Sequence, residues 1–421
     1  LTRIADQHDI ARGTTHGDHV GEAHLPRLID KQPIEALHIL IAREEEGRAA
    51  DHIGAGLHRE AAEAATAAAQ QATEVARQSQ GALTRATQAI QALQAAQAAA
   101  RGAAAASQRS TTLPQVAVPN GLAVGGLQVA PGAVPGSALW QGAALPSQAA
   151  SGGQTTVTVN QTAPQAILNW QSFNVGSQTT LNFNQQAGNW TALNRVVGNT
   201  GPSQILGRIT APGQVLVINQ NGIIFGGASQ INVGSLIASS ANITDGQFGN
   251  GIYASQSGNV YVPNFTGAGG KIVVESGALI TTNAPSSVTA GGGFVLLMGT
   301  EVNNAGAITT PKGQTQFAAG DDFILRAGYG TNANQNSTTR GNEIAPLLRS
   351  GSSSGTVTNT GLVLAQQGDI TLAGHAVTQD GILVSTTSVN QRGTIHLLNS
   401  ASDTSGSITL TSNGISLILP E

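Results

Sequence analysis

The chain has 421 residues, enough for two or three domains and a sizeable hydrophobic core. Its formal net charge is -4, only 10% of its residues are charged, and it contains no cysteine. This composition excludes a basic nucleic-acid-binding protein, because no excess of positive charge is available to neutralise phosphates. It also excludes a disulfide framework and a cysteine-based zinc site. No apolar run reaches the roughly 18 residues of a membrane-spanning helix.

The charged residues concentrate in residues 1–60, a segment that also holds seven of the nine histidines. His16 and His19 flank Asp18 closely enough to suggest a weak metal site. Their spacing fits no i, i+4 pair on a helix, however, and no motif supplies a third ligand. We therefore expect no metal here and assign this segment no function. Because it begins with Leu, we interpret it as a fragment or as a start site placed too far upstream.

The best candidate for an export signal is the apolar run at 34–42. This run is short, contains Glu35 and His38, and is followed by Arg43 and three glutamates. A secretory signal needs an uninterrupted apolar centre after a basic start, so this run is a poor one. Two alternatives stay open: the signal is missing from this chain, or export does not use that route.

Two low-complexity segments separate the charged region from the rest of the chain. Residues 61–108 are rich in Ala and Gln, which lose little side-chain entropy in a helix. Larger apolar residues are sparse there, so we expect a solvated helix, a loose coiled coil or a disordered extension. Residues 109–150 contain five prolines and repeated glycines, which predict an extended linker. We therefore expect residues 1–150 to stay outside the folded core.

From about residue 151 the sequence alternates β-branched and polar residues, a period of two that predicts strands. Each run has five or six residues and ends at Gly, Asn or Pro, with no helical interval between runs. The fold class predicted for 151–421 is therefore all-β. The clearest runs are 155–160, 179–184, 214–219, 271–276 and 369–374.

Two short motifs recur in the C-terminal part of the chain, G-x-I-x-L and V-x-N-x-G. The last two copies of the second motif are 20 residues apart. This period predicts a solenoid of β coils, with Ile, Leu and Val inside and Asn and Thr forming ladders between coils. An immunoglobulin-like array would need a period near about a hundred residues and more aromatic residues. The first motif starts at Gly368, Gly393 and Gly406, and the second at Val302, Val357 and Val377.

Residues 164–243 contain an ordered set of motifs, each weak alone but specific together. They are Asn169-Trp170, Phe173-Asn174 with Gly176, Leu181-x-Phe183, Leu193-Asn194-Arg195-Val196 with Gly198, Ile205-x-Gly207, Val217-Ile218-Asn219 with Asn221-Gly222 and Phe225, and Val233-Gly234 with Leu236 and Ala238-Ser239. This set, about 80 residues long, resembles the N-terminal secretion domain of the filamentous haemagglutinin family, the exported partners of bacterial two-partner secretion.

The resemblance implies a right-handed parallel β-helix, with the secretion domain at 151–270 and further β-helix repeats at 271–421. It also implies a Gram-negative bacterial protein that passes through the periplasm. Its partner would be an outer-membrane β-barrel transporter whose periplasmic domains bind the secretion domain. The absence of cysteine is compatible with this route, because no disulfide can lock a compact shape in the oxidising periplasm.

The resemblance also places a secretion motif on this chain. The family usually has Asn-Pro-Asn-Gly where this chain has Asn-Gln-Asn-Gly at 219–222. Gln can replace Pro in a turn at some entropic cost, and Gly222 supplies a positive φ. We expect a tight turn after strand 214–219, important for export or only for folding. The implied secretion-motif residues are Asn194, Arg195, Asn219, Asn221 and Gly222.

A search for catalytic residues finds no convincing site. Beyond residue 111 the only adjacent acids are Asp321 and Asp322, followed by Arg326, and we interpret them as a solvated turn. His375 and His396 are interpreted as outward-facing strand residues. We therefore predict no enzyme activity, no catalytic or metal-binding residue and no cofactor.

The favoured function is an exported adhesin, secreted or held at the cell surface. Its receptor, a surface protein or glycan of a host or neighbouring cell, cannot be read from these residues. One alternative is the delivery portion of a contact-dependent toxin or haemolysin, because the C-terminus is interpreted as truncated and the distinction would lie beyond Glu421. The other is a carbohydrate-active β-helix enzyme, which would need an acidic cluster on one face of the solenoid.

Overall fold

The computed structural model describes residues 62–77, 117–258, 260–285, 291–328, 341–388, 392–400 and 403–420. The predictions made for residues 1–60, including the His16, Asp18 and His19 group, lie outside them. The chain divides into two compact units, Leu1–Gly81 and Ala82–Glu421. In the first unit, residues 62–77 form a helix with all side chains exposed, and the rest of the predicted 61–108 helix lies outside the described residues.

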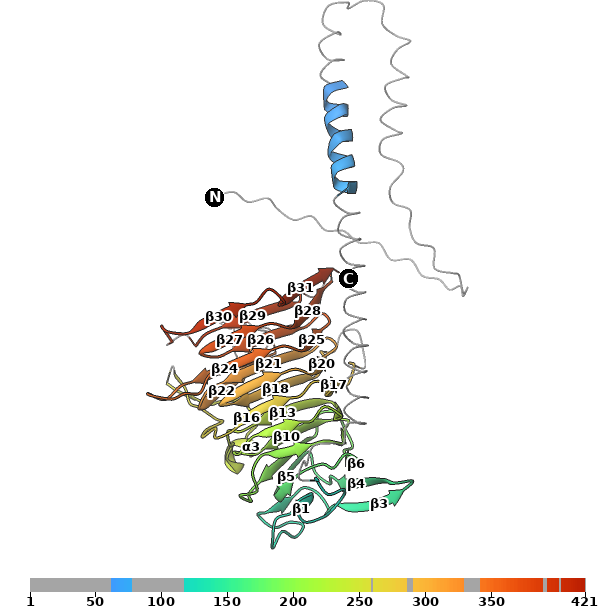
Figure 1. The fold of residues 1–421 in the computed structure, drawn as a ribbon, viewed down its shortest axis with the longest axis vertical. Coiled ribbons are helices and arrows are strands. Elements are labelled where there is room, and N and C mark those ends of the chain that lie inside the picture. The colour runs from blue at the N-terminus through green and yellow to red at the C-terminus, as the bar shows by residue number, and fades with distance from the viewer. Residues whose placement is uncertain are drawn as a thin grey trace, which may run out of the picture. The chain divides into compact units, whose positions relative to one another are not determined.

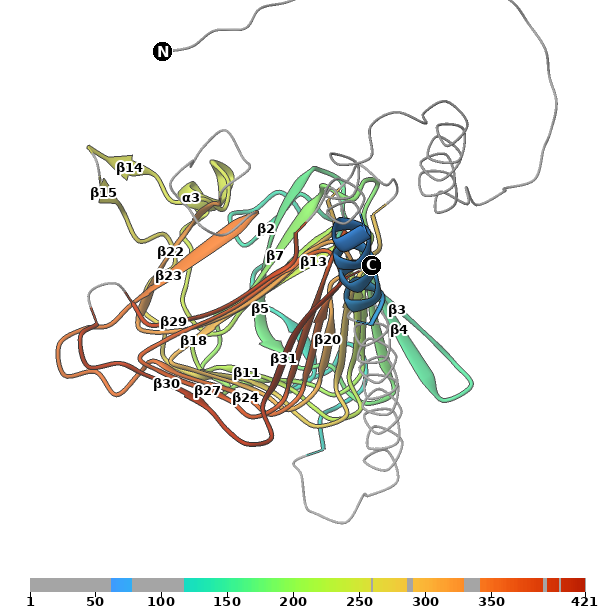
Figure 2. The same ribbon diagram turned by 90° about the horizontal axis from the view of Figure 1, so that it is seen from above.

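The described residues of the second unit, from 117 on, form a parallel β-helix, which confirms the predicted fold class (Figure 1). From β7 on, each coil contributes one strand to each of three sheets, and Figure 2 shows these sheets as the sides of a triangle. The first sheet contains β1 (Leu127–Val129), β2 (Trp140–Gln141), β5 (Gln165–Phe173), β7 (Thr191–Val196), β10 (Gln214–Ile218), β13 (Ser235–Ser239), β18 (Phe294–Gly299), β21 (Gln314–Ala319), β26 (Asp369–Ala373) and β29 (Thr394–Leu398).

The two other sheets complete each coil, and nearly all their pairings are parallel. The second contains β8 (Ser203–Ile205), β11 (Ile223–Phe225), β16 (Lys271–Val274), β19 (Glu301–Asn304), β24 (Thr356–Asn359), β27 (Ala376–Gln379) and β30 (Ser407–Leu410). The third contains β3 (Ser147–Ser151), β4 (Gln154–Asn160), β6 (Thr179–Asn184), β9 (Arg208–Thr210), β12 (Gln230–Val233), β17 (Leu279–Thr282), β20 (Ala307–Thr309), β25 (Leu362–Ala365), β28 (Ile382–Thr387) and β31 (Ile415–Pro420).

Two insertions leave the solenoid after strands of the first sheet. The first carries the short helix α3 (Asp245–Gly249) and the hairpin of β14 (Gln256–Ser257) and β15 (Val260–Tyr261). The second is the hairpin of β22 (Asp322–Ala327) and β23 (Asn342–Leu347). Both lie outside the triangle in Figure 2. They cover the outer face of the first sheet, where Phe248, Phe265 and Phe323 are fully buried with outward-facing Leu and Ile side chains.

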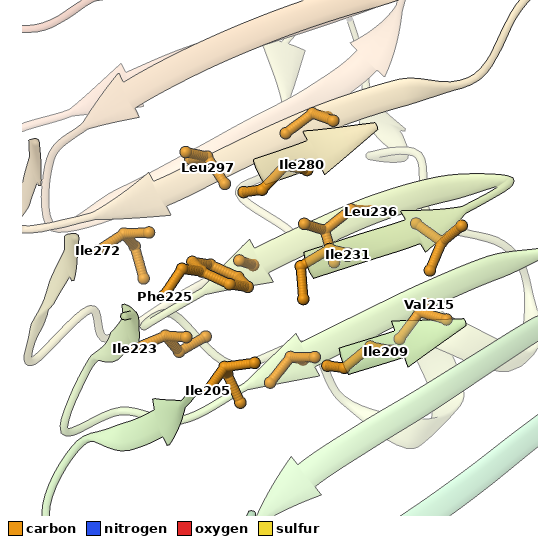
Figure 3. Packing of buried hydrophobic residues seen from close by; sticks show 14 of the residues in the cluster. Ile205, Ile209, Val215, Ile223, Phe225, Ile231, Leu236, Ile272, Ile280 and Leu297 are labelled. Atoms are coloured by element: carbon orange, nitrogen blue, oxygen red, sulfur yellow. The ribbon is translucent and has the colours of Figure 1, made fainter. Parts of the chain in front are cut away.

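The interior is filled by columns of apolar side chains from successive coils (Figure 3). Ile223 lies in register with Ile272, and Ile231 lies between its partners from the coils on either side. Such stacking removes each inward Ile, Leu or Val from water, which stabilises the fold by about 1.5–3 kcal/mol per side chain. The alternation read from the sequence therefore corresponds to inward and outward positions.

Polar ladders also run between coils, as the V-x-N-x-G motif predicts. Its three copies lie on β19, β24 and β27 in one register. Asn304 donates from Nδ2 to Asn359 Oδ1 at 2.7 Å, and Asn359 donates to Gln379 Oε1 at 2.9 Å. All three amides are buried. The G-x-I-x-L motif is less regular: two copies pair on β26 and β29, but the copy at Gly406 leads into β30 of another sheet.

The predicted linker at 109–150 is the main difference between sequence and structure. Residues 117–150 belong to the folded body, and we call them the cap because their strands β1 and β2 pair antiparallel with β5 and cover the first coil. Trp140 is fully buried, with its ring 5.1 Å from that of Trp170 in an edge-to-face arrangement. The glycines and prolines of this segment therefore lie in a packed cover rather than in a free linker. The solenoid needs such a cover, because an uncovered first coil would expose its apolar interior and a strand edge.

Among the residues described, no helix is long and apolar enough to cross a membrane.

Candidate functional site

The predicted turn at 219–222 is present and begins where β10 ends. The Gly222 N–H donates to the Asn219 carbonyl oxygen at 2.8 Å, and the Asn221 N–H donates to Asn219 Oδ1 at 2.9 Å. Asn219 Nδ2 donates to the Gly201 carbonyl and to Ser203 Oγ, both at 3.0 Å. The buried Asn219 side chain thus holds its own turn and ties it to the preceding chain segment.

Both the backbone conformation and the close surroundings of position 222 require a glycine. Its φ is 107°, a left-handed value that favours glycine. A Cβ added here would lie 2.6 Å from the Lys271 carbonyl oxygen of the next coil. Gln220, where the family usually has Pro, is exposed and donates from Nε2 to the Gly267 carbonyl at 3.0 Å. This hydrogen bond provides a restraint that a proline ring would otherwise supply.

Asn194 and Arg195, adjacent in β7, point to opposite faces of the first sheet. Asn194 is fully buried inside the solenoid, where its Oδ1 accepts a hydrogen bond from Trp170 Nε1 at 3.0 Å. Its Nδ2 donates to the Leu216 carbonyl at 3.2 Å. Asn194 is therefore positioned to hold the first coils together and offers no surface to a partner.

Arg195 faces outward and fixes the segment that leads into α3. Its guanidinium donates to the Ile243 carbonyl at 2.7 Å and to Asn242 Oδ1 at 3.0 Å. It also forms an ion pair with Asp245 at 2.7 Å, in the first turn of α3. The Arg195 side chain is only 14% exposed, so most of its polar capacity is already used within the domain.

A hollow of about 420 Å³ brings part of the motif together. The register between β7 and β10 explains where the hollow forms. Ile218 is the parallel-sheet partner of Arg195, so the segments that follow these two strands lie side by side. Asn194 and Gly222 do not line the hollow. Its lining is formed by Arg195, Val196, Val197, Gly198, Asn199, Ile218, Asn219, Gln220, Asn221 and Asn242.

Sequence reasoning missed Val197, Asn199 and Asn242 as members of this surface. Val197 is 50% exposed, and its position beside the Asn219 turn follows from strand register, which no local motif gives. The lining of the hollow contains amide side chains and the half-exposed Val197, and its arginine, Arg195, is already paired with Asp245. Such a surface suits recognition by hydrogen bonding and apolar contact rather than acid–base chemistry.

The acids considered as catalytic candidates hold the second hairpin in place. Asp321 is buried rather than solvated, which corrects the expectation of a solvated turn. Its carboxylate accepts from the Arg349 N–H at 2.7 Å and from Ser352 Oγ at 2.8 Å. Asp322 forms an ion pair with the Arg349 side chain at 2.8 Å. Arg326 pairs instead with Glu343 across the hairpin, at 2.5 Å.

The two C-terminal histidines make different contacts. His375 precedes β27 and lies 2.6 Å from the Asp403 carboxylate, and this contact lowers the pKa of Asp403. His396 lies within β29, and its buried Nε2 has no hydrogen-bond partner among the residues that the structure describes. In the part of the chain that the structure describes, no three His, Asp or Glu side chains gather in a way that could hold a metal ion.

Comparison with known proteins defines the class. The sequence model of the TPS secretion domain, the two-partner secretion family, matches residues 135–417. Because this match covers more than half of the chain, the chain belongs to the TPS secretion domain family. The matched range extends beyond both ends of the 151–270 segment predicted from the sequence, and it includes Trp140 of the cap.

Relatives among characterised proteins cover only part of the chain. A heme/hemopexin-binding protein of Haemophilus influenzae strain Rd is 37% identical over 87 residues, which are 21% of this chain and 10% of that protein. Another Haemophilus influenzae heme/hemopexin-binding protein is 36% identical over 87 residues, 21% of this chain and 9% of that protein. The match thus spans about a tenth of the length of these curated relatives.

A solved structure is also similar. The crystal structure of the HMW1 secretion domain from Haemophilus influenzae superposes with a TM-score of 0.48 at 22% sequence identity. The superposition covers 66% of this chain and 73% of that chain.

Proposed function

We propose that the β-helix is the export module of a two-partner secreted protein. A partner outer-membrane β-barrel transporter would recognise it in the periplasm at the hollow beside Arg195. The observation that carries this proposal is the shared lining of the hollow, where Arg195, Asn219 and Asn221 of the implied secretion motif meet. The family membership established above supports the same role.

Four of the five motif residues, together with Gln220 of the same turn, divide into two roles under this proposal. Asn194 and Gly222 act through folding, because one is inside the solenoid and the other fits tightly against the next coil. Asn219 shapes the turn from within, whereas Gln220 and Asn221 are exposed on it. The transporter would therefore contact the exposed side chains of the turn and Val197 opposite them.

The test separates recognition from folding with exposed positions only. The variants Asn221→Ala and Val197→Ser should reduce export of the full chain beside its cognate transporter about tenfold, the effect of about 1.4 kcal/mol of binding free energy. Their urea-unfolding midpoints should stay at the wild-type value, because Asn221 is exposed and Val197 is 50% exposed. Val262→Ser is the matched control, because Val262 is 45% exposed and lies away from the hollow.

Normal export of both variants would remove the hollow from the recognition surface. A parallel loss of export in Val262→Ser would show instead that export responds to any loss of exposed apolar area. Asn219→Ala completes the series: it should lower both stability and export, because it breaks the three hydrogen bonds made by the Asn219 side chain.

We propose further that the exported protein acts at the cell surface as an adhesin, as the resemblance to filamentous haemagglutinins suggests. The relatives named for heme and hemopexin binding favour a second candidate, capture of such a ligand by the exported protein. Binding of cells that express or lack the protein to host-cell monolayers tests adhesion. Binding of hemin and hemopexin to the same cells tests capture. Only one of these two activities, adhesion or capture, should depend on the protein.

A further inference from the structure

The strand β3 forms an open edge at the N-terminal end of the solenoid. It pairs with β4 on one side and ends the strand order of its sheet, so its other side has no partner strand among the described residues. All five of its residues are exposed. Both Figure 1 and Figure 2 show the β3–β4 hairpin projecting from the body.

The backbone groups that face this open side can be assigned. Ser151 pairs with Gln154 across a two-residue turn in which Gly152 and Gly153 have φ values of 58° and 78°. The Thr155 N–H donates away from β3, to the Gln178 carbonyl, at 2.8 Å. Its β3 partner therefore belongs to a non-hydrogen-bonded pair. That partner is Ala150, and by the same alternation Gln148, two residues earlier, also belongs to a non-hydrogen-bonded pair. The N–H and C=O groups of such residues point away from β4, so those of Ala150 and Gln148 face the free edge.

An apolar groove of about 450 Å³ adjoins this edge. Leu145 and Pro146 line the groove and lead directly into β3, and Gln148 Oε1 accepts at 2.6 Å from the N–H of Leu122, which also lines the groove. Val124 in the lining is 82% exposed and Leu145 is 42% exposed. The groove shares no lining residue with the hollow beside Arg195.

Charge limits what can bind here. No Asp, Glu, Lys, Arg or His occurs between Arg109 and Arg195, so the cap and its hairpin contain no ionisable side chain. A charged side chain buried on this surface would lose hydration and find no counter-charge. Exposed edge strands in natural proteins usually carry Lys, Pro or a bulge that prevents further pairing. The strand Ser-Gln-Ala-Ala-Ser has none of these protections.

We propose that the β3 edge and the apolar groove form a docking surface for an extended, uncharged segment of a partner protein. The segment adds a strand to β3 and places a large apolar side chain in the groove. Main-chain hydrogen bonds supply affinity and the groove supplies specificity, as in other strand-addition complexes. A second copy of this chain is a poorer occupant, because its own β3 offers only Ser, Gln and Ala side chains at the edge.

The test uses the full chain and a labelled peptide in which Leu or Val alternates with Thr. Fluorescence anisotropy should show saturable binding of this peptide and none of a peptide with the same composition and its apolar residues clustered. Two further peptides are N-methylated on alternate residues, in opposite registers. One of the two should lose binding, because only one set of amides faces β3.

Protein variants locate the binding. Ala150→Pro removes the outward N–H without touching the hydrogen bonds to β4, and should weaken binding at least about tenfold. Ala150→Ser keeps that N–H and is its matched control. Leu145→Asn should weaken binding similarly, whereas Val262→Asn, at an exposed apolar position elsewhere, should not. Circular dichroism and the urea midpoint establish that each variant is folded.

Three results would overturn the proposal: no saturable binding of the alternating peptide, equal effects of the two N-methylated registers, or binding unchanged by both Ala150→Pro and Leu145→Asn. A fourth overturning result comes from the oligomeric state of the free protein, measured by sedimentation. A dimer that Ala150→Pro dissociates would show that a second copy, not a partner segment, occupies the edge.

Discussion

The indole N–H of Trp170 donates to the side-chain oxygen of Asn194 at 3.0 Å, and neither side chain reaches solvent. These two residues belong to β5 and β7, consecutive strands of the first sheet. The bond satisfies the single polar atom of a Trp that packs against Trp140 of the cap. A motif residue that the resemblance associates with secretion thus joins the first coil, on which Trp140 of the cap packs, to the second coil.

Asn194→Ala should therefore destabilise the β-helix by about 2–3 kcal/mol, because the buried indole N–H loses its acceptor and no water replaces it. The unfolding free energy from urea denaturation, followed by tryptophan fluorescence, measures the effect. In a Trp170→Phe background, which has no indole N–H, the same substitution should cost less. Equal costs in the two backgrounds would show that the hydrogen bond is not the cause.

The Gly222 turn gives a second prediction with an internal control. Gly222 and Gly251 have nearly identical φ values, 107° and 108°. A Cβ at Gly222 would approach the Lys271 carbonyl oxygen at 2.6 Å, whereas a Cβ at Gly251 would contact nothing within 4 Å. Gly251→Ala should cost about 1 kcal/mol from backbone strain alone. Gly222→Ala should lower the unfolding free energy by clearly more; equal losses would rule out the steric contact.

The buried amide ladder gives a third prediction. Asn359 accepts from Asn304 and donates to Gln379, so Asn359→Ala removes one hydrogen bond from each of two buried amides, at Asn304 Nδ2 and Gln379 Oε1. A loss of about 2–4 kcal/mol is expected, from about 1–3 kcal/mol for each unsatisfied group. Asn184→Ala is the control, because its bond to Asn160 at 2.9 Å is exposed and water replaces it. Similar shifts of the urea midpoint in both variants would contradict this account.

Local pattern was enough to predict the solenoid. The period-two runs became strands with nearly the same bounds, as for 179–184, which is β6. The V-x-N-x-G motif located the ladder because each coil repeats the same inward and turn positions. The cap was missed because Pro and Gly in 109–150 specify turns equally well in a linker and in a packed lid. The burial of Trp140 and the pairing of β1 and β2 with β5 distinguish the two.

The surface around the motif was less predictable than the motif itself. The turn at 219–222 follows from its own residues, since Asn219 and Gly222 each have a local conformational reason to be there. Val197 and Asn242 join it through strand register and through the insertion that carries α3. Such relationships arise between coils, so a single stretch of sequence contains no signal for them.

Asp321 predicts how the second hairpin responds to acid. Burial raises the pKa of this carboxyl group, but the N–H of Arg349, the hydroxyls of Ser352 and Ser354, and the positive charge of Arg349 together outweigh burial, so its pKa lies below the usual value. A carboxylate whose pKa is lower in the folded state stabilises the fold at neutral pH, and this stabilisation is lost as the pH falls through the folded-state pKa.

Asp321→Asn should therefore destabilise the protein at pH 7, by about 1–3 kcal/mol, because the N–H of Arg349 and the hydroxyl of Ser352 lose an ionised acceptor. The difference from wild type should be constant above about pH 5 and should shrink below about pH 4, where aspartate normally becomes protonated. Urea midpoints of both proteins between pH 7 and pH 3 measure it. Ser352→Ala, which removes one of the donors, should show the same pH dependence with a smaller amplitude. A difference between Asp321→Asn and wild type that stays constant down to pH 3 would show that the charge of Asp321 contributes nothing to holding the hairpin.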